Sequence, residues 1–137
     1  MYILVVEDDA SARMALIRLL EGLGHRTCFA ASGERALQHM RIEKPDLVLL
    51  DMVLEGSTMS GWDVAREKLL DPDIRAIPCV IVTGLAPDDV RDRANVVASA
   101  LSGTMLIVPK PVNIDVLRRI IDMVGEGKGP GRDGEPT

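Results

Sequence analysis

Six polar side chains follow the ends of apolar segments, and their types suit phosphoryl transfer. They are Glu7, Asp8 and Asp9 after the first segment, Asp51 after the third, Thr83 after the fourth and Lys110 after the fifth. Clustered carboxylates repel one another unless a cation lies among them, and hard oxygen ligands suit Mg²⁺. A carboxylate beside Mg²⁺ stays ionised and can attack phosphorus, while Lys110 and Thr83 can hold the oxygens of the transferring group. These residue types indicate formation of an aspartyl phosphate.

The apolar segments themselves predict five strands. They are β-branched or rich in leucine and nearly continuous, which is typical of strands buried on both faces; they span Tyr2–Val6, Arg26–Ala30, Leu47–Leu50, Cys79–Val82 and Met105–Val108. Helical patterns lie between them, so a strand–helix unit recurs five times. This order predicts an α/β fold with a parallel sheet, right-handed crossovers and helices on both faces. The carboxyl ends of parallel strands share one edge, where the polar groups would meet.

Local signals mark where the helices begin and end. Asp9, Ser32 and Asn113 are suited to cap helices, Ser60 with Asp63 resembles a capping box, and Pro87 suits a first helical position. Gly125 is expected to end the last helix. The remaining residues to Thr137 are rich in Gly, Pro and charge, so we expect one domain over residues 1–124 and a flexible tail or linker over 125–137.

Composition excludes several other classes of protein. The chain has 137 residues, 47% of them apolar, and a net charge of −5, which suits one globular domain and argues against nonspecific nucleic-acid binding. Cys28 and Cys79 lack the pairing of a disulfide framework or a zinc site, which favours two small buried hydrophobes in a reducing, cytoplasmic compartment. No apolar run reaches the roughly 20 residues that a membrane helix needs. We therefore expect neither a membrane nor a direct nucleic-acid partner.

Several motifs, taken in order, resemble the receiver domain of bacterial two-component response regulators over about residues 2–124. They include Ile3-Leu-Val-Val-Glu-Asp-Asp9, Gly24-His25, Ala31-Ser-Gly-Glu-Arg-Ala-Leu37, Pro45-Asp-Leu-Val-Leu-Leu-Asp51, Ser60-Gly-Trp62, Val80-Ile-Val-Thr-Gly84 and Pro109-Lys-Pro111. No single piece is specific, whereas their joint order and spacing are. The resemblance implies a flavodoxin-like (βα)5 fold with strand order 2-1-3-4-5. In that order the second and fourth strands are separated, so Cys28 and Cys79 are not expected to form a bridge.

The resemblance also implies roles for the polar residues. Asp51 is the expected phosphoacceptor, and Lys110 and Thr83 match the phosphate-pairing lysine and the switch hydroxyl. The expected ligands of a Mg²⁺ cofactor are the side chains of Glu7, Asp8 and Asp51 and the backbone carbonyl of Val53, with Glu7 acting through water. Pro111 matches a proline that usually follows a cis peptide in this family, which would direct Lys110 into the site.

Three features depart from the usual pattern of the family. Ile107 stands where the family often has an aromatic switch residue, three positions before Lys110. The segment from Asp51 to Gly61 is about two residues longer than usual. Val53 and Leu85 are apolar at two positions that influence how water reaches the acyl phosphate, which predicts a long-lived phosphorylated state.

The expected function is that of a phosphorylation-dependent signalling module. A sensor histidine kinase or phosphotransfer protein would donate the phosphoryl group, and the fourth helix, fifth strand and fifth helix would form the face for a downstream protein target or a homodimer. The only expected catalysis is phosphoryl transfer to Asp51 and its slow reversal by hydrolysis. Two alternatives remain open from the residues: a receiver-like module that signals without phosphate, favoured by Ile107, and a Mg²⁺-dependent aspartyl phosphohydrolase, disfavoured because Val53 lacks the acid–base carboxylate. His25 and His39 lack ligand-type neighbours, so surface roles are expected.

Overall fold

The computed structural model describes residues 1–52, 54, 58–83, 105–109 and 112–133, with side chains described at all of these except 83, 105–107, 109 and 126–133. Five parallel strands form one sheet in the order β2-β1-β3-β4-β5. They span β1 Tyr2–Val6, β2 Arg26–Ala30, β3 Leu47–Asp51, β4 Cys79–Thr83 and β5 Met105–Pro109. The predicted flavodoxin-like α/β fold with a parallel sheet is confirmed.

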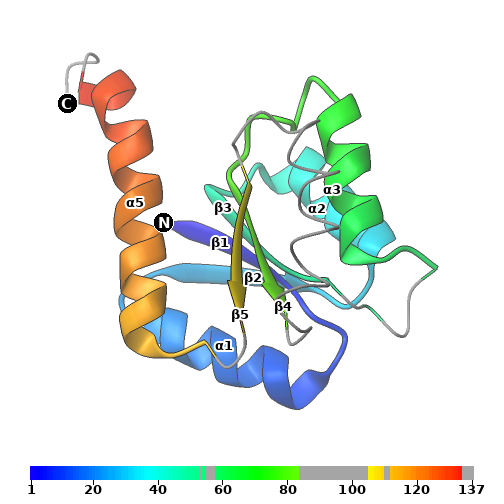
Figure 1. Ribbon diagram of the computed structural model, residues 1–137, viewed down its shortest axis with the longest axis horizontal. Helices are drawn as coiled ribbons and strands as arrows, with labels where there is room; N and C mark the ends of the chain where they lie inside the picture. The colour runs from blue at the N-terminus through cyan, green and yellow to red at the C-terminus, as the bar shows by residue number, and fades with distance from the viewer. Residues whose placement is uncertain (53, 55–57, 84–104, 110–111, 134–137) are drawn as a thin grey trace.

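The described helices cover both faces of the sheet. They are α1 Ala10–Gly22, α2 Gly33–Glu43, α3 Gly61–Leu70 and α5 Ile114–Asp133. Helices α1 and α5 lie on one face and α2 and α3 on the other (Figure 1), and each pair closes its own apolar core. The helix expected to start at Pro87 lies outside the described residues.

Strand residues alternate between the two cores. Leu4, Val48 and Ile81 belong to the core under α2 and α3, whereas Val5, Leu49 and Val80 belong to the core under α1 and α5. Both faces of β1 and β3 are therefore buried, which explains why their sequences show no alternation of apolar and polar residues.

The helix starts follow the local signals. Ser32 Oγ accepts from the Arg35 amide at 3.3 Å, and Asn113 Oδ1 accepts from the Val116 amide at 2.9 Å. Ser60 and Asp63 form a full capping box, in which each side chain accepts from the other residue's amide. These bonds satisfy amides that have no partner within the helix, so the predicted caps are confirmed.

The end of α5 differs from the expectation. The helix continues past Gly125 to Asp133 and extends beyond the sheet (Figure 1). Glycine lowers helix propensity by about 1 kcal/mol but leaves helical dihedral angles open, so Gly125 is a weak stop signal. The division into a domain over 1–124 and a tail over 125–137 stays a prediction.

Candidate functional site at the carboxyl edge of the sheet

Three carboxylates meet at the carboxyl ends of β1 and β3. The paired residues Val6 and Leu50 bring the strands into register, so Glu7 follows directly beside Asp51. One ligand oxygen each of Glu7, Asp8 and Asp51 lies within 4.8 Å of the others. Glu7 and Asp51 are buried, and Asp8 is half-buried. The structure therefore brings together three of the residues expected to hold the cofactor.

The arrangement of these oxygens suits a small divalent cation. An octahedral Mg²⁺ ion with oxygens at about 2.0–2.1 Å has opposite ligands about 4.2 Å apart, close to the spread of the three carboxylates. Burial of like charges is costly unless a cation compensates them. The donor set is made of hard oxygens, which is the chemistry that Mg²⁺ prefers.

The segment carrying Glu7 is fixed by its backbone. The Glu7 amide donates to the Ala30 carbonyl at 3.2 Å, and Arg13 Nη1 donates to the Glu7 carbonyl at 3.0 Å. The Arg13 guanidinium also lies over the Phe29 ring, 4.6 Å from its centroid. Arg13 was not predicted from the sequence, where the only indication of its role is a cation six residues after Glu7, one turn into the helix.

Asp9 has a different role from its two neighbours. Its side chain caps α1 by accepting from the Ala12 amide at 2.8 Å, as expected. The remaining two acidic residues of the run, Glu7 and Asp8, are those that join Asp51. Within this acidic run, Asp9 therefore starts a helix, whereas Glu7 and Asp8 belong to the carboxylate cluster.

The backbone after Asp51 is held by two neighbours. The Met52 amide donates to the Val82 carbonyl at 3.3 Å, and the Met52 carbonyl accepts from the Gly61 amide at 2.8 Å. The first bond extends the pairing of β3 with β4, and the second ties the chain to the first residue of α3. Sequence analysis placed Gly61 only within a motif and did not assign it a structural role.

The other expected site residues are only partly described. Thr83 is the last residue of β4, one position beyond the residue paired with Asp51, so its backbone lies at the same edge. Ile107 pairs with Ile81 inside β5. The predictions for Val53, Lys110 and Pro111, and for Leu85 and the segment 84–104, fall outside the described residues.

A mostly apolar cavity of about 480 Å³ lies beside the carboxylates. It is lined by Glu7, four residues of α1, one residue of β4 and one residue that precedes α5; the full lining is Glu7, Ala12, Ala15, Leu16, Leu19, Val82 and Val112. The acidic cluster is therefore bordered by a low-polarity surface on the side of α1.

Comparison with known proteins identifies the family of this site. The model of the response regulator receiver domain matches residues 3–122, which is most of the chain. This chain belongs to the response regulator receiver domain family. Members of this family are signalling modules of two-component systems and not classical enzymes. In the described part of the chain, no helix is long and apolar enough to cross a bilayer.

Curated relatives include proteins of very different length. Protein PilH of Pseudomonas aeruginosa is 33% identical over 125 residues, which cover 91% of this chain and 98% of PilH. The DNA-binding response regulator MtrA of Mycobacterium tuberculosis is 38% identical over 109 residues, which cover 80% of this chain and 43% of MtrA. The chain thus spans nearly all of PilH and less than half of MtrA.

Solved structures agree on the fold. The receiver domain of a putative LuxO repressor from Vibrio parahaemolyticus superposes with a TM-score of 0.81 at 24% identity, covering 99% of this chain and 98% of that one. The receiver domain of the sensor histidine kinase PA1611 from P. aeruginosa has a TM-score of 0.77 at 25% identity, covering 90% and 97%. That receiver is described with a magnesium ion coordinated in its active-site cleft.

Proposed function

We propose that this chain is a phosphorylation-dependent signalling receiver that accepts a phosphoryl group on Asp51. The observation that carries the proposal is the cluster of Glu7, Asp8 and Asp51 at the carboxyl edge of the sheet, in which Glu7 and Asp51 are buried. A carboxylate in such a cluster can act both as a nucleophile and as a ligand of a divalent cation. The family match over residues 3–122 supports the same assignment.

In the proposed reaction, an oxygen of the Asp51 carboxylate attacks phosphorus. A P–O bond forms while the P–N bond of a donor phosphohistidine breaks, and the leaving imidazole takes up a proton. Glu7, Asp8, Asp51 and the Val53 carbonyl would hold Mg²⁺, with Glu7 acting through water. When bound, Mg²⁺ would neutralise charge on the transferring oxygens. Lys110 and Thr83 would pair with the same oxygens.

The same proposal covers the phosphoryl donor, the switch and the face that binds a partner. The phosphoryl donor would be a sensor histidine kinase or phosphotransfer protein of the cytoplasm. Phosphorylation would draw Thr83 inward and shift a two-state balance at the face formed by the fourth helix, β5 and α5. That face would bind a downstream protein or a second copy, with Ile107 acting as the partner of Thr83 in the switch.

Intact mass after treatment with Mg²⁺ and acetyl phosphate tests the proposal. We expect one added phosphoryl group in the wild type, and none in Asp51→Asn or after removal of Mg²⁺. Asp46→Asn is the matched control, because Asp46 precedes β3 at the opposite edge and its carboxylate accepts from the Tyr2 amide at 2.9 Å. This control is expected to take up phosphate like the wild type.

The alternatives give different outcomes. A wild type that gains no phosphate with several small donors contradicts the proposal and favours a module that signals without phosphate. Multiple turnover of small phosphate esters would instead favour a phosphohydrolase. Uptake that persists in Asp51→Asn would show that another residue accepts the group.

A further inference from the structure

The first residue of α3 lies unusually close to the backbone of Asp51. A Cβ atom built on Gly61 would lie 2.7 Å from Met52 Cα and 3.0 Å from the Asp51 carbonyl carbon, and nearer still to the Asp51 carbonyl oxygen. All three neighbours are backbone atoms, so no side-chain rotation can relieve the overlap. The φ angle of Gly61 is not in the left-handed region, so the position requires space and not conformational freedom.

The direct contact is reinforced by hydrogen bonds on both sides of Gly61. The Gly61 amide donates to the Met52 carbonyl at 2.8 Å, and the preceding Ser60 closes the capping box with Asp63. Thr58 Oγ1 donates to Glu34 Oε1 at 2.9 Å, which ties the approach to α3 to the start of α2. The start of α3 is thus held firmly while it touches the expected phosphoacceptor.

A side chain at position 61 would have to displace one of two fixed pieces of backbone. Relief of the overlap needs a shift of about 1 Å, and a misplacement of that size can cost about 10²-fold in a reaction rate. Moving α3 breaks its bond to Met52, whereas moving Asp51 changes the spacing of the carboxylates. Both movements affect the residue expected to attack phosphorus.

We infer that Gly61 is a positioning residue for Asp51, an inference that rests on the proposed function. It acts by allowing α3 to pack directly against the Asp51–Met52 peptide, which fixes the carboxylate relative to Glu7 and Asp8. The residue touches neither the phosphoryl group nor the cation. Its effect is therefore transmitted through the backbone of the phosphoacceptor.

The test compares Gly61→Ala with variants that disturb the fold elsewhere. Val64→Ala removes a fully buried side chain of α3 without adding an atom against Asp51, and Gly22→Ala adds a Cβ in α1 where nothing lies within 4 Å. Each variant is checked for folding by circular dichroism. The readouts are Mg²⁺ affinity by calorimetry and the rate of phosphorylation at saturating Mg²⁺ and saturating acetyl phosphate.

A positioning role predicts a specific pattern. Folded Gly61→Ala should phosphorylate about 10-fold to 100-fold more slowly at saturation and bind Mg²⁺ more weakly, as expected for misplacement of a reacting group. Val64→Ala and Gly22→Ala should stay within about two-fold of the wild type in both readouts, since neither touches the peptide that positions Asp51. A saturating rate in folded Gly61→Ala equal to that of the wild type, or an equal loss in Val64→Ala, overturns the inference.

A milder pair of variants decides the case if Gly61→Ala does not fold. Ser60→Ala removes the cap of α3 and Ser32→Ala removes the cap of α2, and neither adds an atom against Asp51. Loosening the start of α3 should slow phosphorylation about three-fold, whereas loosening the start of α2 should not, because two cap losses of similar size then act at different distances from Asp51. Equal rates in the two variants overturn the inference.

Failure of the proposed function would be visible separately. In that case the wild type itself takes up no phosphate, and the comparison rests on Mg²⁺ affinity alone. Weaker Mg²⁺ binding in Gly61→Ala than in Val64→Ala would still support positioning of Asp51, and equal binding would overturn it.

Discussion

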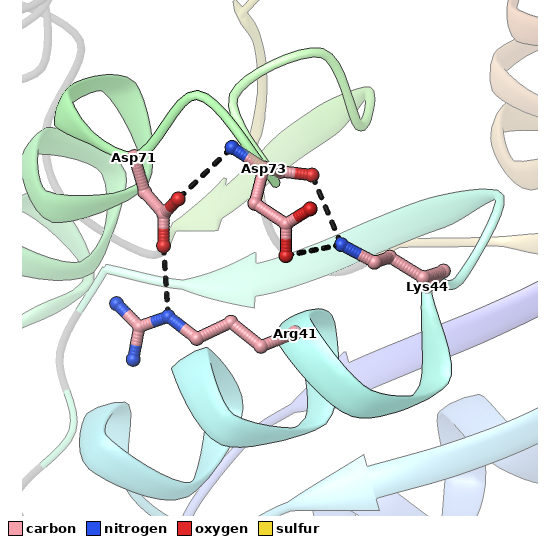
Figure 2. Close-up of polar contacts among 4 residues, drawn as sticks. All are labelled: Arg41, Lys44, Asp71 and Asp73. Atoms are coloured by element: carbon pink, nitrogen blue, oxygen red, sulfur yellow. Dashed lines mark hydrogen bonds and ion pairs between the residues drawn. The ribbon is translucent and has the colours of Figure 1, made fainter.

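The two edges of the sheet differ in how their charged side chains are arranged. At the carboxyl edge, Glu7, Asp8 and Asp51 place like charges within 4.8 Å of one another. At the amino edge, opposite charges pair across the ends of α2 and α3 (Figure 2): Arg41 Nε binds Asp71 Oδ2 at 2.8 Å, and Lys44 Nζ binds both the Asp73 carboxylate and its carbonyl. The pairs at the amino edge tie α2 to the turn after α3, whereas the clustered carboxylates bring together hard oxygens of the kind that a divalent cation prefers.

At the amino edge, the charged side chains also form hydrogen bonds with nearby backbone groups. Asp71 Oδ1 accepts from the Asp73 amide at 2.9 Å, so one carboxylate both shapes the turn and pairs with Arg41 (Figure 2). The buried Lys68 reaches the same turn, where Nζ donates to the Arg75 carbonyl at 2.9 Å. Cys79 follows close by at the start of β4, and burial raises the pKa of its thiol to about 11, which makes it inert.

The largest expected difference between the edges is their response to Mg²⁺. At 100 times its dissociation constant, Mg²⁺ should raise the free energy of unfolding of the wild type by about 2.7 kcal/mol. Asp8→Asn should lose most of this gain because it removes a proposed ligand of the ion, whereas Asp71→Asn should keep all of it. Denaturant unfolding with and without Mg²⁺ measures both, and an equal Mg²⁺ effect in the two variants would break the comparison.

The next largest effect is the change in stability when a carboxylate charge is removed in the absence of Mg²⁺. Asp51→Asn should raise the free energy of unfolding by about 1 kcal/mol, since it relieves repulsion among buried like charges. The gain should vanish when Mg²⁺ is added. Thermal unfolding in a chelating buffer measures it, and Asp46→Asn at the far end of β3 serves as the control. A loss of stability in Asp51→Asn without Mg²⁺ would contradict net repulsion among the clustered carboxylates.

Removing a carboxylate charge at the amino edge should destabilise the fold, and by less than Asp51→Asn stabilises it. Asp71→Asn should lower the midpoint of thermal unfolding slightly, because it removes the pair with Arg41, and high salt should reduce the difference. Bonds from Arg41 and from the Asp73 amide lower the pKa of the Asp71 carboxyl below its ordinary value. Its stabilisation is therefore fully present above about pH 4 and lost as pH falls through the folded-state pKa. Identical pH profiles for the wild type and Asp71→Asn would refute this role.

The smallest effect is expected at Lys68. Burial lowers the pKa of its ammonium group, so the unfolded chain holds this proton more tightly than the folded one. Stability from this residue should consequently rise with pH between the folded-state pKa and the ordinary value of about 10.4. Lys68→Met should leave the free energy of unfolding nearly unchanged at neutral pH and remove that alkaline rise. Denaturant unfolding at pH 7 and pH 10 measures it, and an alkaline rise that persists in the variant would assign it to another group.

Sequence reasoning succeeded where the signal is local. Ser32, Ser60 and Asn113 cap helices because a short side chain meets an amide three residues later, and this pattern can be read along the chain. The convergence of Glu7, Asp8 and Asp51 follows from the rule that parallel strands share their carboxyl edge. The fold and the acidic cluster could therefore be predicted.

The features that escaped prediction depend on contacts between distant segments. The approach of Gly61 to Asp51 needs the actual position of α3, and the burial of Lys68 needs the turn that carries the Arg75 carbonyl. Arg13 gains its role only because Phe29 and the Glu7 carbonyl lie within its reach. The end of α5 was misplaced because one glycine changes helix stability too little to set a boundary.

Locating the phosphoryl group tests the central claim most directly. Protein treated with Mg²⁺ and acetyl phosphate is reduced with borohydride, which converts an aspartyl phosphate to homoserine, and the peptide containing residues 47–52 is sequenced by mass spectrometry. The account predicts homoserine at position 51, dependent on Mg²⁺ and lost in Asp8→Asn. Modification at Asp8 or Glu7, or none in a protein that has gained phosphate, would contradict it.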